Sequence, residues 1–325
     1  MALVNRTLLL ADIGGTNARF ALAGPEGIGR SVSLAVADYA EPEAAIRAFL
    51  DQAKRHGETT PALRRAALAV AGPVSAGTAT LTNGTWRFDA AALEDAFGLE
   101  RLTLVNDFEA IAWALPRLRE MDLLSLGGGK GEAGAPKAVI GPGTGLGMAA
   151  FLPATDRAQE RVLVSEGGHV TMAADSERED RIVEELRRRF GHVSAERVLS
   201  GDGLVNLYEA SAAVDRLPAP SRQPADIVQH AERGDCLASR AALETFCALL
   251  GAFAGDAALT LGARGGVYLA GGILPRLPER LAASEFRERF ETKGRFRGYL
   301  EAIPTWLIQR PDPAFLGLWH LARRE

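Results

Sequence analysis

The chain has 325 residues, of which 47% are hydrophobic and 24% are charged, and its formal net charge is −4. This composition is that of an ordinary folded protein with enough apolar material for a large core, and it excludes intrinsic disorder. A slightly acidic chain lacks the positive surface that nucleic-acid-binding proteins use, so we expect no nucleic-acid partner. The length favours two domains or one large α/β domain.

The sequence also indicates the compartment. Asp12 interrupts the first apolar run too early for a secretory signal, and no uncharged apolar stretch reaches the ~18 residues that a membrane helix needs. The two cysteines, Cys236 and Cys247, do not have the spacing of a zinc site or a disulfide framework. We therefore expect a cytoplasmic protein that does not contact a membrane.

Short apolar runs alternate with segments of helical periodicity along the chain. Strands are predicted at residues 7–10, 19–22, 67–70, 102–105, 138–140, 148–151, 162–164 and 266–269, and helices at residues 43–56, 90–97, 108–115, 179–190 and 239–261. Residues 123–136, which contain three successive glycines, are predicted to form a loop. The alternation favours an α/β fold with parallel or mixed sheets that are covered by helices.

Two of the predicted strands lead into a glycine-rich turn with a threonine and then into another apolar run. The first turn is formed by Gly14, Gly15, Thr16 and Asn17, and the second by Gly143, Thr144 and Gly145. Glycine lets backbone N–H groups approach an anion, and threonine adds a small donor. Two such hairpins in facing lobes are suited to hold one polyphosphate, and Asp12 before the first turn is placed to hold Mg²⁺ through water. An ordinary tight turn also accounts for each segment.

Asn106 and Asp107 follow a predicted strand and precede a predicted helix. In α/β folds ligands bind beyond the carboxyl ends of strands, so a catalytic carboxylate is expected at such a position. The same two residue types are also common helix N-caps, and the pattern alone leaves both interpretations open.

Two other glycine pairs stand beside an apolar run. Glu166 and His169 flank the first pair, and both side chains can hydrogen-bond to sugar hydroxyls, although a polar turn has the same composition. Gly271 and Gly272 form the second pair, which allows a flat nucleoside to approach the backbone or makes an ordinary strand-to-helix turn.

Taken in order, these motifs resemble those of bacterial ATP-dependent glucokinases, within the hexokinase, actin and heat-shock ATPase superfamily. The matching segments are residues 11–20 (ADIGGTNARF), 81–86 (LTNGTW), 104–110 (LVNDFEA), 141–147 (GPGTGLG), 165–169 (SEGGH) and 269–273 (LAGGI). They follow the family's order and cover nearly the whole chain. Each motif alone is common, whereas the ordered set is specific.

The resemblance implies an α/β, two-lobed actin-like (ribonuclease H-like) ATPase fold with a central cleft. The small lobe would comprise residues 1–110 plus 311–325, with a C-terminal helix, and the large lobe residues 111–310. The implied function is transfer of the γ-phosphoryl group of ATP to the 6-hydroxyl of glucose, with Mg²⁺, in a homodimer. Three other functions stay open, namely a kinase for another hexose, a sugar-binding regulatory protein without turnover and an actin-like assembly protein.

The resemblance also assigns roles to individual residues. Asp107 would be the catalytic base, and glucose would be bound by Asn83, Asn106, Asp107, Glu166, His169 and Glu196, together with the backbone near Gly72. ATP would be bound by Asp12, Gly14, Gly15, Thr16, Asn17, Gly143, Thr144, Gly145, Gly271 and Gly272, and Asp12 would also hold Mg²⁺. Without the resemblance, Glu196 is indistinguishable from an acid in the first turn of a surface helix.

Overall fold

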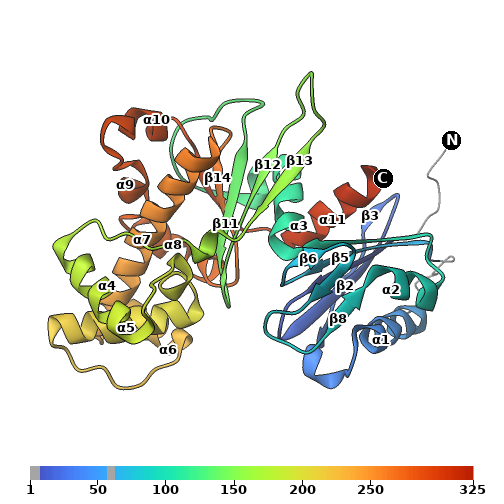
Figure 1. The fold of residues 1–325 in the computed structure, drawn as a ribbon, viewed down its shortest axis with the longest axis horizontal. Helices are drawn as coiled ribbons and strands as arrows, with labels where there is room; N and C mark the ends of the chain where they lie inside the picture. Colours follow the sequence, from blue (N-terminus) through green and yellow to red (C-terminus); the bar gives the residue numbers. More distant parts are fainter. Residues whose placement is uncertain (1–7, 57–62, 325) are drawn as a thin grey trace. The chain divides into compact units, whose positions relative to one another are not determined.

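The computed structural model describes residues 8–56 and 63–324, and the chain forms two compact units (Figure 1). Unit 1 comprises Met1–Leu118 and Arg310–Glu325, and unit 2 comprises Arg119–Gln309. The division lies after the boundary predicted at residue 110, because that boundary would cut helix α3 (Asp107–Ala114), which packs along α11 (Pro313–Arg324) within unit 1. A Cβ atom at Gly317 of α11 would lie 1.8 Å from the Ala110 carbonyl oxygen, so the two helices meet at backbone distance.

Unit 1 is built on a mixed sheet with the strand order β3-β2-β1-β5-β9, and β4 pairs with β2. The central strand β1 (Leu8–Ile13) pairs antiparallel with β2 (Asn17–Gly24) and parallel with β5 (Arg65–Val70). Strand β5 in turn pairs parallel with β9 (Arg101–Asn106). The other elements are β3 (Gly27–Ile28), β4 (Val32–Ala35), α1 (Pro42–Arg55), β6 (Val74–Ser75), β7 (Thr78–Thr80), β8 (Arg87–Asp89) and α2 (Ala90–Phe97).

Both faces of this sheet are covered, with α1 on one side and α3 and α11 on the other (Figure 1). Strands β1 and β5 are consequently buried along almost their full length, which explains why they read as apolar runs rather than as alternating patterns.

Unit 2 has a sheet with the order β10-β15-β14-β11-β12-β13. Its strand β11 (Lys137–Pro142) pairs antiparallel with β12 (Leu146–Leu152) and parallel with β14 (Val267–Leu269), which pairs parallel with β15 (Thr305–Ile308). The arrangement around β11 is therefore the one found around β1, and the two glycine-rich turns occupy equivalent hairpins. The other elements are β10 (Leu123–Gly127), β13 (Arg161–Ser165), α4 (Glu177–Phe190), α5 (Gly201–Asp215), α6 (Pro224–Arg233), α7 (Leu237–Leu261), α8 (Pro278–Ala282), α9 (Phe286–Glu291) and α10 (Arg297–Glu301).

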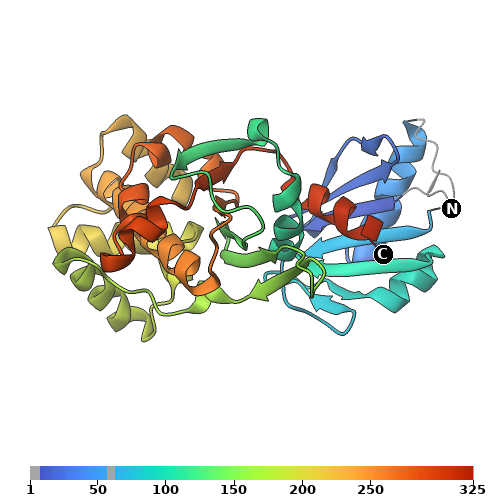
Figure 2. The ribbon, with the colours of Figure 1, turned by 90° about the horizontal axis from the view of Figure 1, so that it is seen from above.

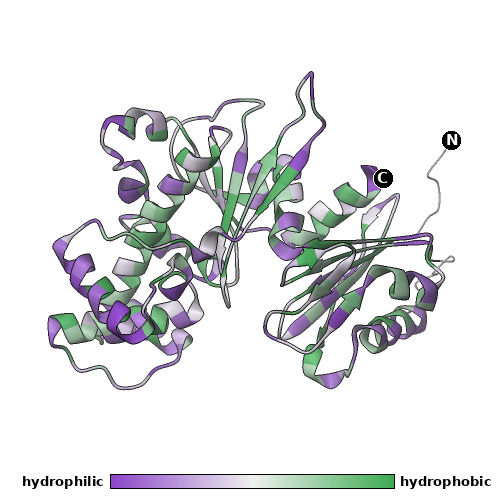
Figure 3. Cartoon of the chain, in the orientation of Figure 1, coloured by the Kyte–Doolittle hydropathy of each residue, from purple (hydrophilic) through white to green (hydrophobic). Residues whose placement is uncertain are grey.

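Helix α7 is the centre of the core of unit 2. Helices α4 to α7 gather on one side of the sheet (Figures 1 and 2), and α7 is mostly apolar whereas α4 is largely hydrophilic (Figure 3). By length and composition α7 resembles a membrane span, with a mean hydropathy of 1.4 in its most apolar window, but 83% of that window is buried within the structure. A helix that is apolar on all sides is expected in such a buried position.

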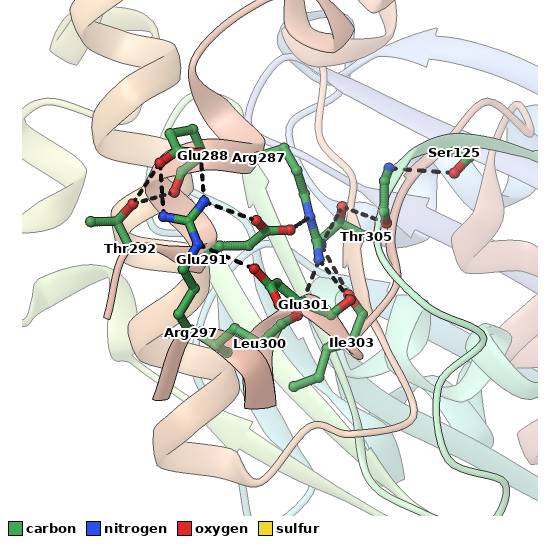
Figure 4. A network of polar contacts seen from close by, with 11 residues as sticks. Ser125, Arg287, Glu288, Glu291, Thr292, Arg297, Leu300, Glu301, Ile303 and Thr305 are labelled. Carbon is green, nitrogen blue, oxygen red and sulfur yellow. Dashed lines mark hydrogen bonds and ion pairs between the residues drawn. The ribbon is translucent and has the colours of Figure 1, made fainter. Parts of the chain in front are cut away.

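A polar cluster joins α9 and α10 to strand β15 of this sheet (Figure 4). The guanidinium group of Arg287 donates hydrogen bonds to the carbonyl oxygens of Ile303 at 2.9 Å and Leu300 at 3.0 Å, and to the hydroxyl of Thr305 at 3.1 Å. Its Nε also donates to Glu291 at 2.6 Å. Because the Arg287 side chain is only 17% exposed, these contacts satisfy carbonyl groups that water reaches poorly.

The structure confirms the alternating α/β pattern, and every predicted strand and helix corresponds to an element of the same type. Residue 7 of the first predicted strand lies outside the described residues. The loop predicted at residues 123–136 is wrong in part, because residues 123–127 form the edge strand β10, which pairs with β15. Its partner lies far along the chain, so local pattern did not reveal it.

Candidate active site

Strand β9 ends at Asn106, and helix α3 begins at Asp107. Asn106 is the N-cap of α3, since its Oδ1 accepts hydrogen bonds from the backbone N–H groups of Phe108 at 2.9 Å and Glu109 at 3.3 Å. Its Nδ2 donates to the carbonyl oxygen of Gly72 at 3.2 Å, which ties the start of α3 to the segment after β5. Asn106 therefore caps the helix, and Asp107 is the first helical residue rather than the cap.

The carboxylate of Asp107 lies in an environment that disfavours its charge. Its Oδ1 accepts the N–H of Phe108 at 3.0 Å. Burial, reinforced by the negative charge of Asp12, raises the pKa of Asp107 from 3.8 to about 6. A carboxylate with such a pKa is mostly ionised at neutral pH yet basic enough to accept a proton from a reacting hydroxyl group.

Asp12 lies at the end of β1 and is directly opposite Arg19 on β2. Burial raises the pKa of Asp12, and the Arg19 guanidinium, 3.4 Å from Oδ2, opposes this shift. Arg19 also lies 3.5 Å from Oδ1 of Asp312, a residue just before α11 that has a left-handed φ of 48°. Arg19 and Asp312 were given no role in the sequence analysis. The hairpin register identifies Arg19, whereas no local pattern pointed to Asp312.

The first glycine-rich turn closes the β1–β2 hairpin. The N–H of Gly14 donates to the carbonyl oxygen of Asn17 at 3.0 Å, while Gly15, Thr16 and Asn17 are exposed. A Cβ atom at Gly15 would lie 2.9 Å from the carbonyl oxygen of Asn83, so glycine is required for this approach. Unit 1 therefore brings Asp12, Asp107, Asn83 and this turn into one region, which is compatible with the glucose-binding and ATP-binding roles that the resemblance implies for them.

The second glycine-rich turn closes the β11–β12 hairpin of unit 2. The N–H of Gly143 donates to the carbonyl oxygen of Gly145 at 2.8 Å, and Thr144 between them is exposed. Gly271 has a φ of +91°, and a Cβ atom there would lie 2.3 Å from the carbonyl oxygen of Pro142. The Gly271–Gly272 pair is thus packed beside the turn, so both predicted nucleotide-binding segments of unit 2 are neighbours.

Glu166 and His169 lie at either end of a single 3-10 turn after β13. Their side chains are 72% and 60% exposed, and His169 Nε2 is 4.0 Å from Glu166 Oε2. Two solvent-accessible polar groups on one short turn are suited to bind several hydroxyl groups of one small molecule.

Glu196 lies in a second 3-10 turn, which packs beside the turn that carries Glu166 and His169. Its carboxylate forms no ion pair with the residues that the structure describes, and Oε2 instead accepts the backbone N–H of Leu146 at 2.9 Å, at the start of β12. Glu196 therefore lies close to the turn that carries Glu166 and His169, as the resemblance implies, and also to the second glycine-rich turn, a contact that no sequence motif predicted.

The residues present fit a magnesium ion that binds mainly through water and phosphate. Mg²⁺ prefers oxygen ligands and usually keeps several of its waters, with one or two carboxylates from the protein. Asp12 supplies such a carboxylate near Asp107. Among the described residues, no group of three or more His, Cys, Asp and Glu side chains is arranged to hold a metal ion directly.

Comparison with known proteins places these features in a family. The glucokinase family model matches residues 9–325. The chain is 51% identical over 316 residues to the glucokinase of Paramagnetospirillum magneticum, covering 97% of each chain, and 46% identical over 313 residues to that of Nitrobacter hamburgensis, covering 96% of each. The crystal structure of a glucokinase from an Antarctic psychrotroph is similar, with a TM-score of 0.88 and 37% identity over 99% of this chain and 100% of that one. The chain belongs to the glucokinase family.

Proposed function

We propose that Asp107 is the general base of the glucokinase reaction, in which this chain transfers the γ-phosphoryl group of ATP to glucose. In this mechanism the carboxylate of Asp107 accepts the proton of the 6-hydroxyl as that oxygen attacks the γ-phosphorus in line. A bond forms between O6 and phosphorus, the bond from phosphorus to the β–γ bridging oxygen breaks, and ADP leaves with glucose 6-phosphate as the second product. General-base catalysis of this kind contributes ~10²–10⁴-fold to the rate.

The observation that carries this proposal is the environment of Asp107. It is a desolvated carboxylate on the first residue of α3, directly after strand β9; its pKa is raised to about 6, and it lies near Asp12 in the region of the first glycine-rich turn. Strongly perturbed carboxylates of this kind are concentrated at catalytic sites.

The remaining site residues are proposed to position the substrates. Glu166, His169, Glu196, Asn83 and Asn106 would bind glucose hydroxyls. The two glycine-rich turns would donate backbone N–H groups to the phosphates of ATP, and Gly271-Gly272 would lie against the nucleoside. Asp12 would hold Mg²⁺ through water, and the ion, when bound, neutralises charge on the phosphates. Because the transition state of phosphoryl transfer is loose, alignment and charge stabilisation account for most of the acceleration.

The broader features implied by the family likeness belong to the same proposal. It includes the two-lobed, actin-like fold with a central cleft that the family likeness implies, in which residues of both units would act on one pair of glucose and ATP. The proposal also includes a homodimer, a cytoplasmic location and a place at the start of glucose breakdown. Their support is the family membership and, for the location, the burial of the long apolar helix α7.

A coupled ADP-release assay with Mg·ATP tests the function. We expect turnover with glucose that exceeds turnover with fructose, mannose and N-acetylglucosamine, and a loss of ~10²–10⁴-fold in kcat for Asp107→Asn. The matched control is Asp95→Asn, which changes an exposed aspartate on α2 of the same unit. Turnover on another sugar alone would keep the mechanism and reject glucose as the substrate. Tight glucose binding without turnover would favour a regulatory sugar-binding protein.

A further inference from the structure

Glu196 is in direct contact with the second glycine-rich turn. Its Oε2 accepts the N–H of Leu146 at 2.9 Å, and a Cβ atom at Gly145 would lie 2.5 Å from the same oxygen. The carboxylate therefore rests against the bare backbone of the turn, in space that any side chain at residue 145 would occupy.

The backbone around Glu196 is anchored to the sugar-side turn. The N–H of Ala195 donates to the carbonyl oxygen of Val170 at 2.9 Å, and Val170 in turn donates to the carbonyl oxygen of Gly167 at 3.3 Å. The hydroxyl of Ser200 donates to the carbonyl oxygen of Glu196 at 2.9 Å. Glu196 thus reaches from the segment that carries Glu166 and His169 to the turn that carries Thr144.

A second support holds the other end of the same turn. The N–H of Gly201, the first residue of α5, donates to the carbonyl oxygen of Gly143 at 2.9 Å. The turn is consequently held at Gly143 by the backbone of α5 and at Leu146 by the side chain of Glu196. The contact at Gly143 is made by backbone groups alone, whereas the contact at Leu146 is made by a side-chain carboxylate that can also bind a ligand.

We propose that Glu196 is a positioning residue that couples glucose binding to ATP binding. One carboxylate oxygen keeps the Leu146 N–H engaged and so preserves the shape of the turn. Oε1 accepts no hydrogen bond from the described residues, which leaves it available to a glucose hydroxyl. A hydroxyl bound there restrains the carboxylate and therefore the turn, so that each substrate tightens the binding of the other by the same factor. The inference rests on the phosphate-binding role proposed for this turn.

Calorimetric titration with the non-hydrolysable analogue AMPPNP and Mg²⁺, with and without saturating glucose, tests the coupling. For the wild type we expect glucose to tighten analogue binding roughly fivefold or more. In Glu196→Ala the analogue should bind roughly tenfold more weakly even without glucose, since the charge-assisted hydrogen bond to Leu146 is lost, and the effect of glucose should vanish. Glu196→Gln keeps an acceptor oxygen for Leu146, so its analogue affinity without glucose should stay near the wild-type value while glucose binds more weakly.

The matched control is Glu184→Gln, which removes an exposed charge on α4 that pairs with Arg188. If Glu196→Ala does not fold, Glu196→Asp replaces it, because the shorter side chain withdraws the carboxylate from Leu146. The inference is overturned if Glu196→Ala, or Glu196→Asp in its place, leaves analogue affinity without glucose unchanged, which would confine the role of Glu196 to the sugar. It is overturned in a different way if Thr144→Ala and Gly145→Ala also bind the analogue normally, because the turn would then have no role in binding phosphate.

Discussion

Replacing Asp107 with asparagine is expected to lower kcat by ~10²–10⁴-fold and at the same time to stabilise the fold. The pKa of Asp107 is 3.8 in ordinary surroundings and about 6 in the structure, because burial and the charge of Asp12 disfavour the carboxylate. Between these two pH values the folded protein retains a proton that the unfolded chain has lost. The free energy of unfolding therefore falls as the pH rises through this window, and this loss of stability is complete above about pH 6.

The size of the effect follows from the same two pKa values. A shift of about 2 units corresponds to about 3 kcal/mol at pH 7.5, and to about half of that at pH 5, where part of the window has still to be crossed. Asparagine has no charge to desolvate, and its amide oxygen can accept the Phe108 N–H that Asp107 now accepts. At pH 7.5 the variant should therefore be more stable than the wild type by an amount that shrinks on acidification.

Urea denaturation of wild type and Asp107→Asn at pH 5 and pH 7.5, followed by tryptophan fluorescence, measures this difference. Asp95→Asn on α2 serves as the control, because replacing an exposed aspartate should change the free energy of unfolding little at either pH. A variant that is less stable than the wild type at pH 7.5, or a stability difference that is the same at both pH values, would refute the conclusion that burial and Asp12 disfavour the charged form of Asp107.

Three further predictions follow from particular contacts. With Asp107 as base, kcat/KM for glucose should fall about tenfold per pH unit below a midpoint near pH 6. This midpoint should move to lower pH in Asp12→Asn, because Asp12 helps to raise the pKa of Asp107. A kcat/KM that does not change with pH below pH 6 in the coupled assay would contradict the role of Asp107 as the base. Arg287→Lys should lower the free energy of unfolding by about 2 kcal/mol in urea denaturation, because an ammonium group cannot reach the carbonyl oxygens that the guanidinium joins. The change should be much smaller for Arg297→Lys, whose side chain is 44% exposed. Equal losses of stability in the two variants would contradict the importance given to the burial of Arg287. Gly145→Ala should raise the KM for ATP roughly tenfold, because its Cβ would meet the Glu196 carboxylate at 2.5 Å and displace it from Leu146. Gly298→Ala is the control and should leave the kinetics unchanged, because a Cβ atom at residue 298 would have nothing within 4 Å. An unchanged KM for ATP in Gly145→Ala would argue against the contact between Glu196 and the turn.

Local sequence pattern was sufficient to predict the strands and turns that carry the candidate site. A central strand that is buried on both faces must read as a continuous apolar run, and a hairpin that lets backbone N–H groups face an anion needs glycine, so β1, β11 and their turns were visible from sequence. The cross-strand pair of Asp12 and Arg19 follows from the same hairpin register. These features depend on residues that are neighbours along the chain or directly across one turn.

Features that depend on distant segments were not predictable in this way. Strand β10 is recognised only through its pairing with β15, almost at the other end of unit 2. Asp312 lies near Arg19 because it directly precedes α11, which packs within the same unit. Glu196 and Leu146 are 50 residues apart, and nothing in the short segment around Glu196 distinguishes its contact with a turn from an exposed helix acid. Tertiary packing alone creates these three relationships.

Helix capping and catalysis are not competing explanations of the Asn106-Asp107 pair. Asn106 accepts the two N–H groups that a cap must satisfy, so the first turn of α3 does not require a carboxylate at residue 107. The carboxylate there is nevertheless disfavoured by burial and by Asp12, and asparagine would be the more stable choice on the reasoning above. The charge at residue 107 disfavours the fold, and the helix does not require it. The proton transfer from a sugar hydroxyl proposed for Asp107 does require a carboxylate there at neutral pH, so the proposal accounts for a residue that stability alone does not.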